Sequence, residues 1–598
     1  MRLHRLFHVL LAFTLGIGLL AGRLLWLQTW GGASPRGSAA TDATAMSVRQ
    51  RAQGVTLDPG RGHIADRTGE PLTGVTVEGL LLLPGGADRL TESERRQLAR
   101  VLDVSPMLLL DEWRKAERPT WWNPGARDRG ASPAALTREQ AEAIRRLRLS
   151  GATVASAVKR YPERRIAAHL VGFVAEQPER MTALYEKQLA DGQLSLSTPI
   201  GAAGLELAFD RLLHGAGESR IVSYIDGHGE GLDGLGMKTV GSSNPYYPLR
   251  LITTVDAAAQ RAVEAAADAA GLDKGAVVVL DAATSDIVAM ASRPAYEDEH
   301  LSPQGDDWAN RAIRAVAPGS IMKSFVAAVA LEEGVVRPDE TFDCDGTYGR
   351  YGLTCWKEGG HGHITFAEAL AASCNIAFAE VGERLGGETL QRYATALGVS
   401  GTVGWKDVSD VDGRPLTQLP EEQENRLFAA APSDADGGIL AQTAIGQRDA
   451  RWTPLAAANW MATLARGGAP ASPRAAAELR YADGHAVERY AAKALPGGEA
   501  AISPRTTRLV HGMLEGVVQG GTGASLRNAS WPLAGKSGTA EATVGGRDVV
   551  HQWFAGYGPV DRPRYAVAVL AESRPLGSAN RATAVFKAVM DALAALPE

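Results

Sequence analysis

The sequence predicts an α+β protein in which a central antiparallel sheet is flanked by helices. An elongated α+β region and an N-terminal transmembrane helix are expected to precede this sheet. Apolar strand-like runs stand at both ends of the second half with helical segments between them, which indicates one sheet completed by the C-terminus. The 598 residues are 45% hydrophobic and 22% charged, as in globular proteins. The chain should therefore fold around extensive cores.

Composition excludes several classes of protein. The 62 basic and 68 acidic residues leave a net charge of -6, which gives no general attraction for nucleic acid. Three cysteines are too few for an iron–sulfur or multi-zinc protein. A mean hydropathy of -0.11 excludes a polytopic membrane protein but allows a single anchor.

Residues 7–27 are predicted to form that anchor, after a cytoplasmic stub of residues 1–6. A helix of this length measures about 30 Å and crosses a bilayer if Arg23 extends its charge to the surface. Arg2 and Arg5 place the N-terminus in the cytoplasm, so the rest of the chain is expected outside the cell membrane. A cleaved signal peptide is the alternative, because the uncharged core is short.

Residues 28–50 are rich in Gly, Ala, Ser and Thr, which is typical of a linker. Residues 51–250 have mixed character, with an apolar run at Gly79–Leu83 and capping boxes that begin helices at Thr91 and Thr137. Because no nucleophile with a plausible base stands out, we expect this region to be a scaffold, or pedestal.

Residues 251–598 are predicted to form the catalytic domain. A short strand leads into an alanine-rich helix, and two apolar runs then surround a turn, as in a hairpin of buried strands. The predicted strands of the sheet are Gly275–Asp281, Asp286–Ser292, Leu533–Thr543, His551–Tyr557 and Tyr565–Ala571, and the last helix is Asn580–Leu596.

The first chemical motif is Ser320-Ile321-Met322-Lys323, which follows Pro318 and Gly319. The Pro-Gly entry places Ser320 at the start of a predicted helix, and Lys323 lies on the same helical face. An amine there can accept the proton of the hydroxyl if desolvation lowers its pKa, which makes an activated serine without a histidine.

The second motif is Ser373-Cys374-Asn375, at a break between two predicted helices. A hydroxyl and a carboxamide two residues apart can face one cleft, where Ser373 relays a proton and Asn375 donates to a substrate carbonyl.

The third motif is Lys536-Ser537-Gly538-Thr539, in a predicted strand. A cation and two hydroxyls can bind a carboxylate, and Gly538 allows a substrate backbone to approach closely. A phosphate-binding P-loop is the alternative, since Gly535-Lys536-Ser537 matches its end. We reject it because Ser530 stands where the loop needs glycine and no amphipathic helix follows.

Each motif alone has little weight, because S-x-x-K recurs at Ser156 and S-x-N recurs at Ser242 and Ser578. Their order along the chain, however, resembles that of penicillin-binding proteins and serine β-lactamases. Arg61–Gly69 is similar to the R-G-x-I-x-D-R-x-G signature that opens the pedestal of class B penicillin-binding proteins. Arg160–Val174 and Gly201–Glu206 resemble two further blocks of the pedestal in that family. For Arg61, Asp66, Arg67 and Glu206 we expect structural ion pairs.

The resemblance implies a monofunctional D,D-transpeptidase that cross-links peptidoglycan stem peptides, since no glycosyltransferase motifs are present. Ser320 would attack the penultimate D-Ala carbonyl and Lys323 would be the base. Ser373 and Lys536 would relay the proton to the leaving amine, and Asn375 would orient the donor. Ser537 and Thr539 would hold the terminal carboxylate beside Gly538, with the backbone N–H groups of Ser320 and Thr539 as the oxyanion hole. β-Lactams imitate the donor and would acylate Ser320.

The resemblance further implies a membrane glycan polymerase as partner, and a homodimer is possible.

Two other functions remain open. A D,D-carboxypeptidase or β-lactamase would use the same motifs with water as acceptor, although the long pedestal favours the transpeptidase. The second open function is a catalytically silent β-lactam sensor or cell-wall scaffold. The intact Ser320, Lys323 and Lys536 disfavour this function.

No cofactor and no metal are expected. Cys344, Cys355, His361 and His363 suggest a zinc site, but their spacing fits no standard zinc finger and the serine motifs need no metal. We instead expect a disulfide between Cys344 and Cys355 outside the cell, with Cys374 as a free thiol.

Overall fold

The computed structural model describes residues 2–29, 52–124, 132–191, 194–215, 217–224, 237–241, 244–296, 306–430, 436–497 and 502–597. It divides into two compact units. The first comprises Met1–Gly60, Thr76–Lys159 and Gly217–Ser243, and the second comprises Arg61–Val75, Arg160–Ala216 and Asn244–Glu598. These units do not follow the linear division at residue 250, because three stretches of the expected pedestal, 61–75, 160–216 and 244–250, belong to the second unit.

Helix α1 (Arg2–Thr29) contains the apolar segment of the first unit. Residues Phe7–Leu25 have a mean hydropathy of 1.8, and none of these residues is buried in the protein. This N-terminal helix is long and apolar enough to cross a membrane, so it is compatible with a single-pass anchor. Of the predicted linker, residues 30–50 lie outside the described residues.

The rest of the first unit combines two small sheets with short helices. One sheet has the order β1-β8-β9 and the other β4-β3-β5. The predicted capping boxes are confirmed at Thr91 and Thr137, where each threonine accepts from the backbone N–H three residues on. Buried Leu80, Leu98 and Trp113 belong to its core. The elements are β1 (Ala52–Asp58), β3 (Val75–Leu82), α3 (Gly86–Arg89), α4 (Glu92–Val101), α5 (Pro106–Arg114), β4 (Thr120–Trp121), α6 (Arg138–Leu147), β5 (Ala152–Lys159), β8 (Ser219–Tyr224) and β9 (Lys238–Val240).

The second unit is built on a five-stranded antiparallel sheet of order β12-β11-β21-β20-β19. Its strands come from both ends of the unit, so the expected completion of the sheet by the C-terminus is confirmed. The bounds are β11 (Gly275–Asp281), β12 (Ile287–Arg293), β19 (Ala534–Val544), β20 (Arg547–Gly558) and β21 (Tyr565–Arg574).

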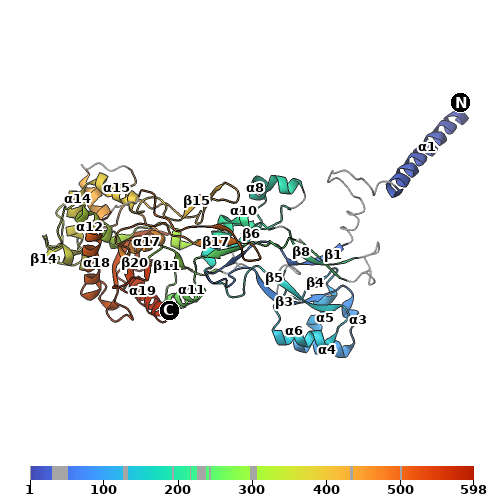
Figure 1. Ribbon diagram of the computed structural model, residues 1–598, viewed down its shortest axis with the longest axis horizontal. Helices are drawn as coiled ribbons and strands as arrows, with labels where there is room; N and C mark the ends of the chain where they lie inside the picture. The colour runs from blue at the N-terminus through green and yellow to red at the C-terminus, as the bar shows by residue number, and fades with distance from the viewer. Residues whose placement is uncertain are drawn as a thin grey trace. The chain divides into compact units, whose positions relative to one another are not determined.

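Alternate residues of this sheet enter two different cores, because successive strand side chains point to opposite faces. Val277 and Val279 pack with residues of α11 (Ala257–Ala269) and α19 (Arg581–Ala594). Ala276 and Val278 join the larger core on the other face, with residues of α12 (Met322–Glu332) and α17 (Pro454–Ala465). Helices thus cover both faces of the sheet (Figure 1).

A helical region is inserted between β12 and β19. Nine consecutive residues of α12, Met322–Ala330, are buried; most are apolar, and Lys323 and Ser324 are buried with them. Helices α12 and α14 lie at the end of the unit that also contains β14 (Figure 1). The other inserted elements are β13 (Thr341–Cys344), β14 (Gly362–Thr365), α13 (Phe366–Ala371), α14 (Asn375–Leu385), α15 (Gly387–Ala396), β15 (Lys406–Val408), β16 (Pro415–Thr417), α16 (Gly437–Ala444), β17 (Ala476–Arg480), β18 (Ala486–Arg489) and α18 (Pro504–Gln519).

The first pedestal-like block of the second unit is joined to the rest of that unit by strand pairing. Strand β2 (His63–Ala65) pairs in parallel with β10 (Arg250–Thr253), in a sheet of order β18-β17-β10-β2. The short elements of the second block are α7 (Ala168–Val171), β6 (Val174–Ala175), α8 (Pro178–Ala190), β7 (Ile200–Gly201), α9 (Gly204–Ala208) and α10 (Asp210–Leu213).

Buried charges tie the same blocks together. Arg61 donates to Glu206 and to Asp210, each at 2.8 Å, and Arg160 also donates to Glu206. Glu206 is fully buried, and its pKa falls because the two arginines outweigh the desolvation that alone would raise it. The structural interpretation of Arg61 and Glu206 fits this network, which contains no nucleophile.

Candidate active site

Ser320 lies in the 3₁₀ turn η4 (Gly319–Ile321) that leads directly into α12. Gly319 has φ +55°, and a Cβ there would stand 2.4 Å from the carbonyl oxygen of Thr539. A Cβ on Gly538 would likewise stand 2.8 Å from the carbonyl oxygen of Pro318. The two glycines therefore allow the backbone of the first motif to lie against the strand of the third.

Lys323 extends from the first turn of α12 into a fully buried position. Its Nζ donates to the carbonyl oxygen of Ser373 at 2.8 Å and to Oδ1 of Asn375 at 2.7 Å, and lies 3.3 Å from Oγ of Ser373. The first and second motifs thus meet through this amine. Burial lowers the pKa of Lys323 to about 7, so that a neutral amine is accessible near neutral pH.

Ser373 occupies the sharp break between α13 and α14. Its φ is +57°, a left-handed conformation that usually favours glycine at the end of a helix. Backbone bonds hold this turn, from Ser373 N–H to Leu370 and from Cys374 N–H to Ala369. A strained residue held by its surroundings is common at catalytic sites.

Lys536 and its neighbours lie on β19, which is the edge strand of the large sheet. The Lys536 amine is buried and donates to the carbonyl oxygen of Ser537 at 2.9 Å. Desolvation, and then the charge of Lys323, lower the pKa of Lys536 well below its ordinary value. Two nearby ammonium groups disfavour each other, so the charge of Lys323 adds to the desolvation that favours a neutral Lys536.

The remaining residues of the third motif differ in exposure. Ser537 is buried, and its hydroxyl donates to Oγ1 of Thr522 at 2.7 Å, whereas Thr539 is exposed. Gly538 accepts a hydrogen bond from Asn580 through its carbonyl oxygen. The side chain of Thr539 is therefore available to a ligand at the free edge of the sheet.

Three contacts of the motif residues were not predicted from sequence. Trp356 Nε1 lies 3.2 Å from the carbonyl oxygens of both Ala372 and Ser373. The carbonyl oxygen of Thr354 accepts from Nδ2 of Asn375 at 3.0 Å. Thr522, at the end of the loop after α18, contacts Ser537. No local signal in the sequence marks these residues, because each lies in a loop at least 15 residues from its partner.

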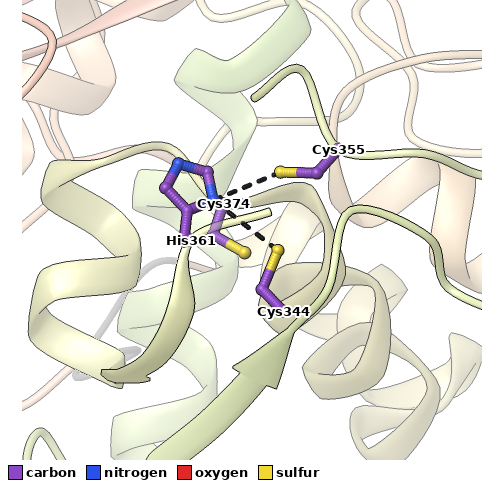
Figure 2. Close-up of side chains that lie close together, drawn as sticks. All are labelled: Cys344, Cys355, His361 and Cys374. Atoms are coloured by element: carbon purple, nitrogen blue, oxygen red, sulfur yellow. Dashed lines mark hydrogen bonds between the residues drawn. The ribbon is translucent and has the colours of Figure 1, made fainter. Parts of the chain in front are cut away.

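The expected disulfide is wrong, since Cys344, Cys355 and Cys374 are all free thiols. Nδ1 of His361 lies 3.6 Å from Sγ of Cys344 and 3.3 Å from Sγ of Cys355, and Figure 2 shows Cys374 beside them. Cys374 is a free thiol, as expected, but it does not stand apart from the other two cysteines. Folding brings its thiol into a group with the other two.

The duplicate motifs lie in other settings. Ser156 and Lys159 belong to strand β5, where residues three apart point to opposite faces and cannot act together. Ser578 donates to a backbone carbonyl within a loop, and Ser242 lies outside the described residues. Lys536 lies inside a strand of eleven residues, so the P-loop alternative has no helix to follow it.

Comparison with known proteins agrees with this geometry. Residues 275–591 match the penicillin binding protein transpeptidase domain, and residues 56–234 match the penicillin-binding protein dimerisation domain. Stage V sporulation protein D of Bacillus subtilis is 27% identical over 554 residues, covering 89% of this chain and 77% of its own length.

Two further proteins are similar over most of the chain. Peptidoglycan D,D-transpeptidase MrdA of Haemophilus influenzae is 27% identical over 581 residues, covering 90% of this chain and 84% of its own length. The crystal structure of a D,D-transpeptidase domain from Eggerthella lenta covers 89% of this chain and 97% of its own, with a TM-score of 0.57 and 22% identity, which supports the fold. With both domains matched and the first motif in contact with the second and the third, the chain belongs to the class B penicillin-binding proteins.

Proposed function

We propose that the chain is a serine-type peptidoglycan D,D-transpeptidase in which Ser320 forms the acyl-enzyme. The observation that carries the proposal is the buried Lys323 amine, one helical turn after Ser320 and bonded to both ends of the S-x-N motif. Desolvation lowers the pKa of this amine to about 7, which suits a base at neutral pH. The family and the named activity of the relative MrdA support the same reaction.

In the acylation step, Oγ of Ser320 attacks the carbonyl carbon of the penultimate D-Ala while its proton passes to Lys323. The backbone N–H groups of Ser320 and Thr539 would stabilise the tetrahedral oxyanion, since Gly319 and Gly538 bring these two segments together. The C–N bond to the terminal D-Ala then breaks. Its nitrogen takes the proton that Lys323 accepted, relayed by Ser373 and Lys536.

The other motif residues would position the donor peptide. Asn375 would orient its amide, and Ser537 and Thr539 would bind its terminal carboxylate beside Gly538, whose missing side chain leaves room for the peptide backbone. In the second step the amine of a neighbouring stem peptide attacks the ester, the new peptide bond forms, and Ser320 recovers its proton. A β-lactam enters the first step as a donor analogue and remains on Ser320.

The domain organisation proposed with this function is a stub of residues 1–6, an anchor of 7–27, a linker of 28–50, a pedestal of 51–250 and a transpeptidase domain of 251–598. We place the N-terminus in the cytoplasm because of Arg2 and Arg5, and the catalytic domain outside. The helix α1 supports the anchor. A membrane glycan polymerase is the proposed partner, and self-association as a dimer is a further proposal.

The test uses the full chain in detergent with a fluorescent penicillin. Covalent labelling of the wild type, its loss in Ser320→Ala and its retention in Ser156→Ala are expected. The second variant removes the serine of the other S-x-x-K sequence, which lies in β5. Absence of labelling in folded wild-type protein would refute the acyl-serine mechanism. A donor peptide and an acceptor amine then distinguish cross-linked product from the hydrolysed product of a carboxypeptidase or β-lactamase.

A further inference from the structure

Three arginines gather at the loop between α16 and α17, residues 446–452, which we call the arginine loop. Arg426 donates from Nε to the carbonyl oxygen of Asp449 at 3.1 Å. Arg451 donates from a terminal nitrogen to the carbonyl oxygen of Arg448 at 2.7 Å. The guanidinium group of Arg448 lies 3.4 Å from the carboxylate of Asp449. All three guanidinium groups therefore lie on one short stretch of backbone.

The positive charge of this loop exceeds the negative charge that pairs with it. Among the described residues, Asp449 is the only carboxylate within ion-pair distance of the three guanidinium groups, and it pairs with Arg448. Arg426 and Arg448 are exposed, and Arg451 is half-buried. Because guanidinium groups remain protonated in proteins, an anion that reaches this loop would meet cations that the protein does not neutralise.

The backbone of Arg448 adopts an unusual conformation. Its φ is +59°, in the left-handed region that residues with a side chain seldom adopt. Such strain persists only where the surrounding structure holds it, and it is common at functional sites. An exposed cation thus stands at a position where the backbone alone would favour glycine.

Both ends of the arginine loop are bonded to the segment that precedes the nucleophile. The N–H of Gly319 donates to the carbonyl oxygen of Gly446 at 2.9 Å. Val316 and Trp452 exchange backbone hydrogen bonds of 3.0 and 2.9 Å. The loop therefore runs beside the three residues that lead directly to Ser320.

The same segment brings the arginine loop close to the large sheet. Nε1 of Trp553 on β20 donates to the carbonyl oxygen of Ala317 at 2.9 Å. His551, two residues earlier on β20, pairs with Ala540 of β19. Burial lowers the pKa of His551, and the positive charge of Arg451 lowers it further. The charge of the loop thus acts on the sheet position that directly follows the third motif.

The binding mode proposed above directs the donor peptide toward this position. Its terminal carboxylate is assigned to Ser537 and Thr539, and its scissile carbonyl to the backbone N–H of Thr539. An extended peptide on the free edge of β19 then continues along the strand past Thr539. Ala540 and its partner His551 share one face of the sheet, whereas Glu541 lies on the other face. The residue before the D-Ala pair therefore lies on the arginine side of the strand.

We infer that Arg448 and Arg451 bind a carboxylate on the side chain of the residue that precedes the D-Ala pair. The enzyme would thereby select stem peptides with an acidic residue at that position. Guanidinium groups bind carboxylates through charge-assisted hydrogen bonds, which are stronger than those between neutral groups. Arg426 is a positioning residue, because it holds the loop through the Asp449 carbonyl. The inference rests on the proposed function, which supplies the course of the peptide.

Peptide binding to the full chain in detergent tests the inference, with Ser320→Ala as the background so that no acyl transfer occurs. The two probes are D-Ala-D-Ala peptides that differ only in the preceding residue. One carries meso-diaminopimelate with its free side-chain carboxylate, and the other carries the same residue with a carboxamide in its place. The carboxylate peptide is expected to bind about tenfold more tightly, and added salt should reduce this preference. Equal affinity, or no binding of either peptide, would overturn the inference.

Arg448→Gly in the same background tests the residue. It removes the cation and relieves the left-handed φ, so loss of folding is not expected. The preference should fall to less than about twofold. Arg148→Gly is the matched control, since Arg148 is also exposed and left-handed, with φ +48° at the end of α6. A preference that survives in Arg448→Gly, or that is lost equally in Arg148→Gly, would overturn the assignment.

The binding measurement also separates this inference from the proposed function. Absence of penicillin labelling in the wild type would count against the acyl-serine mechanism. The preference for a carboxylate is measured without acyl transfer, so it would still be judged by the affinities of the two peptides.

Discussion

The approach of η4 to β19 can be tested by adding one methyl group. Gly319→Ala places a Cβ 2.4 Å from the carbonyl oxygen of Thr539, closer than any relaxed structure permits. Because the obstructing atom belongs to the backbone, one of the two segments must move. Gly334→Ala is a matched control, since Gly334 has a similar φ of +67° but no atom within 4 Å of its would-be Cβ.

The two substitutions separate conformational strain from displacement of the site. Alanine in the left-handed region costs roughly 1–2 kcal/mol, so Gly334→Ala should lose about that much free energy of unfolding, and Gly319→Ala should lose more because of its backbone clash. Only Gly319→Ala also displaces Ser320 from Thr539. A shift of about 1 Å can cost on the order of 100-fold in rate, so penicillin acylation should slow by about that factor in Gly319→Ala alone.

The assay combines denaturant unfolding with the second-order rate of acylation by a fluorescent penicillin, measured well below the unfolding transition. Equal acylation rates for Gly319→Ala and wild type would refute the argument that this glycine sets the distance between Ser320 and the oxyanion-binding strand. Equal slowing of both variants would also refute it, because strain alone would then explain the effect.

Three further predictions follow from the same contacts. The acylation rate should rise with pH through about 7, because the Lys323 amine is neutral only above its lowered pKa, and a flat profile from pH 5 to 9 would contradict its role as base. Glu206→Gln should lower the free energy of unfolding by about 3 kcal/mol, since Arg61 and Arg160 lose their buried partner, while the protein that remains folded is still labelled by penicillin. Ser373→Gly should raise the free energy of unfolding by up to about 1 kcal/mol, because glycine adopts the left-handed φ without strain, and it should reduce the acylation rate. Ser373→Ala should reduce the acylation rate without raising the free energy of unfolding. Denaturant midpoints and penicillin-labelling rates distinguish the two variants.

Local sequence determined the elements of the protein. The apolar runs predicted β11, β20 and β21, and the capping boxes predicted the starts of α4 and α6, because such signals depend on neighbouring residues only. The order of the three serine motifs likewise indicated the family. These features need no knowledge of which distant segments meet.

Only the tertiary structure decided what those segments form together. Strand pairing between β2 and β10 joins residues near position 64 to residues near 251, so the compact units are discontinuous in sequence. Cys344, Cys355 and Cys374 illustrate the same point at the site. Their spacing matches no zinc finger, and a local disulfide was the expectation from sequence. Folding instead brings Cys374 to the other two thiols and to His361, because the turn that positions Ser373 also turns its neighbour into the cluster.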